Sequence, residues 1–153
     1  MYAFLLALHS LVRWVVVAAA VQALAIAWTG WLSPRPFTPL GRRSAAILTG
    51  ALDLQILVGL ALYFLASPIT RTALSSFGAA MGEPQVRYWL VEHPVLALLA
   101  AALAHVGSVR ARRAVAEVDR WRRAAAFFTA AAVAVAATVP WPFRAVHRPL
   151  WPW

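Results

Sequence analysis

Residues 3–28 read AFLLALHSLVRWVVVAAAVQALAIAW, and this stretch determines the fold. An α-helix of roughly 20 apolar residues crosses the hydrocarbon core of a bilayer, so the stretch is long enough to span a membrane. His9 and Arg13 are its two titratable side chains. The sequence therefore predicts a transmembrane helix that carries two polar groups at membrane depth.

Three further segments are apolar enough to cross the bilayer, namely residues 44–66, 87–109 and 124–139. The last is short and rich in alanine, which favours close packing against neighbouring helices. The connection 69–85 is only moderately hydrophobic and is compatible with a short interfacial helix. Because no internal repeat is visible, we expect a single domain over 1–153. We predict an all-α membrane protein folded as an up-down four-helix transmembrane bundle.

The composition supports a multi-pass membrane protein. The chain is 63% hydrophobic and only 12% charged, and its mean hydropathy is +0.72. A soluble domain of this length could not cover so much apolar surface. The chain has no cysteine, which excludes disulfides, thiolate metal sites, iron–sulfur clusters and covalently attached haem.

The arginines predict the orientation of the bundle. The net charge of +9 comes from arginine alone, because the chain contains no lysine. The first and third connections hold the largest groups, which are Arg35, Arg42 and Arg43, and Arg110, Arg112, Arg113, Arg120, Arg122 and Arg123. The positive-inside rule places both connections in the cytoplasm and both termini outside. We expect these arginines to contact lipid head groups, with no role in binding nucleic acid.

His9 and His93 lie at similar depths in two of the predicted spans. His9 follows Tyr2 by seven residues and His93 follows Arg87 by six, so each lies about 10 Å along its helix. The first and third helices face each other diagonally in an up-down bundle, where two imidazoles can ligate one iron. We therefore predict His9 and His93 as the metal ligands of one haem b. The alternative is two separate structural histidines, each bonded to a carbonyl or hydroxyl.

Arg13 is a further candidate cofactor-binding residue. It lies one turn from His9 on the same helix face. A charge at this depth requires a partner. Two partners are open, namely a haem propionate, which a guanidinium matches well, and Asp53 in the second span.

His105 is a candidate cofactor-binding residue of a different kind. It follows His93 by twelve residues, which turns it to another face of the third helix. A quinone head group, a proton path, a pigment with one axial ligand and a structural role all remain open. Pro94 bears on the depth of His93, because proline either kinks a helix or lies in its first turn, and a helix that begins near Glu92 would place His93 at a shallower depth.

Several motifs together resemble a family of small four-span bacterial membrane proteins described as b-type cytochromes. They are Leu8-His9-Ser10-Leu11-Val12-Arg13-Trp14, residues 54–64, Arg87-Tyr88-Trp89-Leu90-Val91-Glu92-His93, Ala104-His105-Val106-Gly107-Ser108 and residues 139–144. The resemblance implies haem binding and electron transfer in the bacterial inner membrane. It also implies roles for His9, Arg13, Gln55, Glu92, His93 and His105, whereas Pro94 departs from the family pattern.

Two functional hypotheses follow. In the first, the protein is a haem b electron carrier between a quinol pool and a redox partner at the outer face, as a subunit of a larger respiratory or photosynthetic complex. In the second, it is a non-redox accessory or scaffolding subunit, whose histidines are structural or each hold a (bacterio)chlorophyll. The sequence contains no arrangement of catalytic acids, bases or nucleophiles.

Overall fold

The computed structural model describes residues 1–33, 35–37, 39–143 and 145–146. Its long helices are α1 (Tyr2–Leu32), α2 (Pro39–Ala61), α6 (His93–Arg113) and α7 (Glu117–Thr138). Its short elements are the π-helical turns η1 (Leu62–Ala66) and η2 (Tyr88–Glu92) and the helices α3 (Pro68–Ser75), α4 (Phe77–Gly82) and α5 (Pro84–Arg87). The described part of the chain is helical and has no strand, which confirms the all-α prediction.

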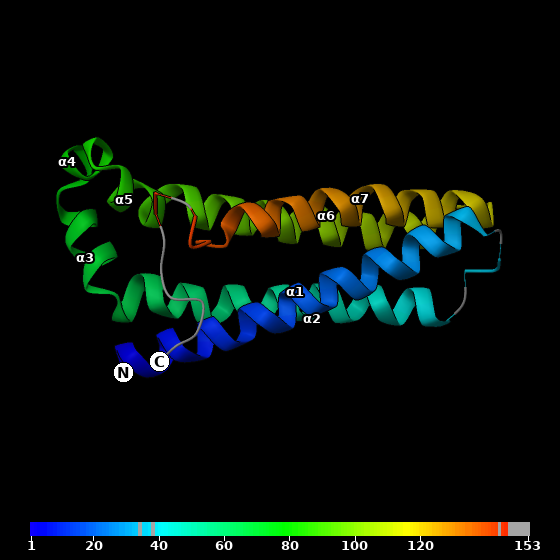
Figure 1. Cartoon of the computed structure of the whole chain (residues 1–153), viewed down its shortest axis with the longest axis horizontal. Helices are drawn as coiled ribbons and strands as arrows, with labels where there is room; N and C mark the ends of the chain where they lie inside the picture. Colours follow the sequence, from blue (N-terminus) through cyan, green and yellow to red (C-terminus); the bar gives the residue numbers. More distant parts are fainter. Residues whose placement is uncertain (34, 38, 144, 147–153) are drawn as a thin grey trace.

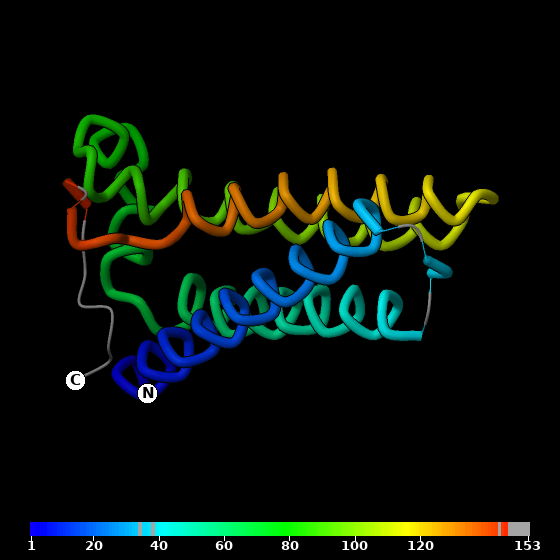
Figure 2. The backbone as a smooth tube through the Cα atoms, turned by 45° about the vertical axis from the view of Figure 1, so that its right-hand side comes forward, coloured from blue at the N-terminus to red at the C-terminus, as the bar shows by residue number. Residues whose placement is uncertain are grey.

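The four long helices form an elongated bundle (Figure 1). α1 packs on α2 and α6 packs on α7, and further contacts join α1 to α7 and α2 to α6. α1 runs obliquely, from α2 at the end that carries α3 to α7 at the other end, as both views show (Figure 2). We call this second end, which carries the α1–α2 and α6–α7 connections, the arginine-rich end.

Three continuous helical segments are long and apolar enough to cross a membrane, namely Tyr2–Leu32, Pro39–Ala66 and Pro84–Arg113. They indicate a multi-pass membrane protein in contact with the lipid bilayer. The second begins earlier than the predicted residue 44, because Pro39 is compatible with the first turn of a helix. α7 is less apolar, since its first two turns carry several charged residues.

The residues between the second and third segments form the short helices α3, α4 and α5. The short helical structure expected in the connection 69–85 is thus confirmed. These helices lie at the end of the bundle where α1 begins (Figure 1).

Trp121 closes the arginine-rich end. Its side chain is only 1% exposed, its indole N–H donates to the Arg35 carbonyl oxygen at 2.9 Å, and its ring packs against Phe37 with centroids 4.6 Å apart. A Cβ at Gly30 would overlap the indole ring, and one at Gly41 would lie 2.9 Å from it. Two glycines therefore make room for one large side chain.

Candidate functional site

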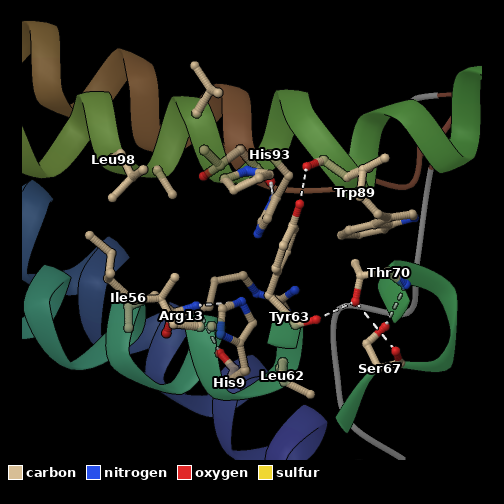
Figure 3. Close-up of a pocket in the computed structure, with 18 of the residues that line it drawn as sticks. His9, Arg13, Ile56, Leu62, Tyr63, Ser67, Thr70, Trp89, His93 and Leu98 are labelled. Atoms are coloured by element: carbon tan, nitrogen blue, oxygen red, sulfur yellow. Dashed lines mark hydrogen bonds between the residues drawn. The ribbon is translucent and has the colours of Figure 1, made fainter. Parts of the chain in front are cut away.

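The helices line a partly open cavity of about 560 Å³ in the half of the bundle next to α3 (Figure 3). Its wall is mostly apolar, and the polar side chains that line it include His9, Arg13, Gln55 and His93. Pockets for cofactors and small molecules measure ~300–1,000 Å³ and combine an apolar wall with a few placed polar groups. This cavity is therefore the candidate functional site.

His9 lines the cavity from α1, and its ring lies against α2. The side-chain amide of Gln55 donates to His9 Nε2 and to the His9 backbone carbonyl oxygen, each at 3.1 Å. Gly59, one turn further along α2, makes room for the ring, since a Cβ there would lie 3.2 Å from His9 Cε1. Because Nε2 accepts a hydrogen bond, the proton of the neutral ring is on Nδ1.

His93 lines the cavity from α6, on the side opposite His9 (Figure 3). Its Nδ1–H donates to the backbone carbonyl oxygen of Thr138 at 3.0 Å. Thr138 is the last residue of α7, where carbonyl groups lack an intrahelical partner. The Tyr88 hydroxyl donates to the same oxygen at 2.8 Å. Since a carbonyl can only accept, Nε2 of neutral His93 is the unprotonated nitrogen, which is the form that ligates metals.

Pro94 is accommodated without ending the helical segment. It occupies the first turn of α6, directly after the π-helical turn η2. A proline has no N–H, so the carbonyl of Leu90 four residues earlier loses its usual donor. The Tyr63 hydroxyl replaces this donor and bonds the Leu90 oxygen at 2.9 Å. The α-helix thus begins close to Glu92, as considered from the sequence. The π-helical turn η2 precedes it directly, so the helical segment is continuous across this point.

The structure brings His9 and His93 together. Their ring centroids are 6.0 Å apart and the ring planes are inclined by 60°. Their role as metal ligands remains a prediction.

Arg13 lines the same cavity as the two histidines. Its guanidinium lies 5.5 Å from the centre of the Trp14 ring. Asp53, the alternative partner of Arg13 considered from the sequence, pairs with His105.

His105 lies outside the cavity. Its Nε2 is 2.9 Å from Asp53 Oδ1, and both side chains are about half exposed on the surface between α2 and α6. Glu92 pairs with Arg87 at 2.9 Å rather than with a histidine. Of the candidate site residues, His9, Arg13, Gln55 and His93 gather at the cavity, whereas His105 and Glu92 do not line it.

Sequence reasoning did not identify Gly59, Tyr63, Tyr88 and Thr138 as positioning residues. The spacing of Gln55 and Gly59, four residues apart on one helix face, is the signal that could have linked both to one ring. Thr138 acts through its backbone, which no side-chain pattern indicates.

Two imidazoles, those of His9 and His93, line this cavity among the described residues. Among the residues that the structure describes, no group of three or more histidine, cysteine or carboxylate side chains gathers where it could hold a metal ion. The described residues alone therefore do not build a closed zinc site, which takes four protein ligands. No protein-family model, curated protein sequence or solved structure matches this chain.

Proposed function

We propose that this protein is a membrane b-type cytochrome that carries electrons through one haem b held between His9 and His93. The observation that carries the proposal is the 6.0 Å separation of the two imidazole centroids across an apolar cavity. The resemblance of the sequence motifs to small four-span b-type cytochromes is consistent with it.

The spacing of the rings fits ligation of one metal ion. An imidazole nitrogen binds a first-row metal at about 2.0–2.1 Å and lies about 1.1 Å from its ring centre, so two rings on opposite sides of one ion have centres about 6 Å apart. A porphyrin supplies the other four ligands of an iron that two histidines hold. This division of ligands agrees with the two imidazoles that the described residues present to the cavity.

The surroundings of His93 also favour a ligand role. Metal-ligating histidines almost always donate their second ring N–H to a carbonyl, carboxylate or water, which fixes the ring and its tautomer. The bond from His93 Nδ1 to the Thr138 oxygen is of this kind. It leaves Nε2 as the ligating atom.

His9 requires one local change. Its Nε2 accepts from the Gln55 amide, so ligation by this nitrogen replaces that hydrogen bond. The other amide atom, Oε1, is buried and receives no hydrogen bond from the described residues. The hydrogen bonds of the Gln55 amide go to His9 alone, so its release from Nε2 can leave the second bond, to the His9 carbonyl oxygen, in place.

Arg13 supplies the positive charge that a haem needs for its carboxylates. A guanidinium forms two parallel hydrogen bonds with a carboxylate, so Arg13 on the cavity wall would bind a propionate. When bound, the haem supplies one-electron chemistry, and the protein supplies ligation, charge compensation and exclusion of water.

We further propose that α7 is a fourth span and that both termini lie outside in a bacterial inner membrane. α7 has 22 residues, about 33 Å of helix, and packs along α6 and α1. With four spans, both arginine-bearing connections lie on one side, as the positive-inside rule requires.

An absorption spectrum of the purified protein, with chemical quantification of haem, tests the proposal. We expect about one haem per chain and a sharp α-band in the b-type region after reduction. Near-infrared pigment bands would instead favour a (bacterio)chlorophyll subunit, and a protein expressed with haem in excess but purified without a chromophore would contradict the cytochrome assignment.

A further inference from the structure

Asp53 and His105 form a polar pair on the outer surface of the bundle. Asp53 Oδ1 and His105 Nε2 are 2.9 Å apart, and each side chain is 51% exposed. Neither makes another side-chain hydrogen bond within the described part of the chain. The second Asp53 oxygen and His105 Nδ1 therefore remain as two neighbouring acceptors.

The pair lies at membrane depth. About 15 Å of helix separates Asp53 from Arg43 at the arginine-rich end, and about 8 Å separates His105 from Arg110. Both residues belong to helical segments apolar enough to span a bilayer. Ionisable groups exposed to hydrocarbon are costly and mark functional sites by default.

An apolar seam leads from this pair to the cavity. Leu57 and Leu60 follow Asp53 by four and seven residues on α2, and Leu98 precedes His105 by seven on α6, so each shares a helix face with the pair. All three leucines are exposed, and Leu60 and Leu98 also line the cavity. Gly50, one turn before Asp53, leaves open space, since a Cβ there would meet no atom within 4 Å.

We propose that this seam binds a lipid-soluble hydroquinone with an apolar tail. Its hydroxyl group donates to Asp53 and His105, and its tail lies along Leu57, Leu60 and Leu98. The inference rests on the proposed function, because an electron carrier within the membrane needs a redox partner that dissolves there.

The chemistry of the pair favours this ligand over a second copy of the chain. With neutral His105 donating Nε2–H to Asp53, the pair offers acceptors to its surroundings. A symmetric copy would bring the same acceptors against them, whereas a hydroquinone brings donors.

Photolabelling in phosphatidylcholine nanodiscs tests the proposal. The probe is an azido-benzohydroquinone with a ten-carbon tail, unlabelled decylubiquinol is the competitor, and labelled peptides are mapped by mass spectrometry. We expect competitor-sensitive labelling of α2 and α6. The oxidised probe, which presents carbonyl acceptors instead of hydroxyl donors, should label at least tenfold less.

The decisive variant is Asp53→Leu/His105→Leu, which removes both acceptors while keeping a membrane-compatible surface. We expect at least a tenfold loss of labelling. Gln22→Ala is the matched control, because Gln22 is an exposed polar residue of α1, which carries none of the seam residues, and labelling of this variant should be unchanged. Undiminished labelling in the double variant would overturn the proposal. An unlabelled wild type that is a dimer, together with a monomeric double variant, would also overturn it, because the pair would then contact a second copy of the chain.

Haem content measured on the same samples separates this inference from the proposed function. The double variant should retain the reduced α-band of the wild type. A wild type that holds haem but is not labelled would overturn the hydroquinone site alone. A wild type that is labelled but holds no haem would leave the site standing and contradict the cytochrome assignment.

Discussion

The Nδ1–H of His93 donates to the backbone carbonyl oxygen of Thr138 at 3.0 Å, which joins the first residue of α6 to the last residue of α7. The contact satisfies a carbonyl that the end of α7 leaves without a helical donor. It also fixes the orientation and tautomer of the imidazole. One hydrogen bond thus contributes both to helix packing and to the chemistry of the cavity.

The two cavity histidines should each be required for haem retention. If His9 and His93 hold the haem as proposed, His9→Ala and His93→Ala should each abolish the haem signal, because each removes one of the two proposed ligand nitrogens. Haem per chain and the reduced α-band of the purified variants measure this. His105→Ala is the control and should keep its haem, since His105 lies outside the cavity. Full haem content in either cavity variant would disprove the ligand assignment.

A side chain at Gly59 should displace the ring of His9. Even a Cβ at this position would lie 3.2 Å from His9 Cε1, so we expect Gly59→Val to lower haem occupancy severalfold. Gly50→Val is the matched control on the same helix, because no atom lies within 4 Å of a Cβ there. Equal haem occupancy in the two variants would show that the ring does not depend on this gap.

The Tyr63 hydroxyl should stabilise the fold because it replaces the amide donor that Pro94 lacks. In Tyr63→Phe the buried Leu90 carbonyl loses this bond, and we expect the free energy of unfolding to fall by about 1–3 kcal/mol. Unfolding in mixed detergent micelles measures the change. In the Pro94→Ala background the backbone N–H of residue 94 can donate to the Leu90 carbonyl. Tyr63→Phe should therefore lower the free energy of unfolding clearly less in this background. An equal cost in both backgrounds would rule out this explanation.

Gly30→Ala should destabilise the bundle at the arginine-rich end. Its Cβ would overlap the ring of Trp121, and overpacking of this kind typically costs about 1–3 kcal/mol. Gly50→Ala should instead be neutral or stabilising by up to about 1 kcal/mol, since it only improves helix propensity. Thermal unfolding, monitored by circular dichroism, compares the stability of the two variants with that of the wild type. A Gly30→Ala protein as stable as the wild type would mean that the Trp121 side chain can shift with little loss of free energy.

The sequence was sufficient to predict the helices and the approach of His9 to His93. Apolar length defines a span, and equal depth on diagonal helices follows from topology alone. The partners of Asp53 and Gln55 could not be predicted in this way. These residues are two positions apart on α2 and face different directions, and the choice of His105 for one and His9 for the other depends on how α2 is rotated against α1 and α6. Periodicity shows which residues share a face, but not which faces of different helices meet.

The enclosure of Trp121 by Gly30 and Gly41 has a consequence for biogenesis. The contacts that fasten this end involve no residue that lines the cavity. If the protein holds the proposed haem, helix assembly at this end would not depend on it. Maturation of such a protein would then be a loading step rather than a folding step.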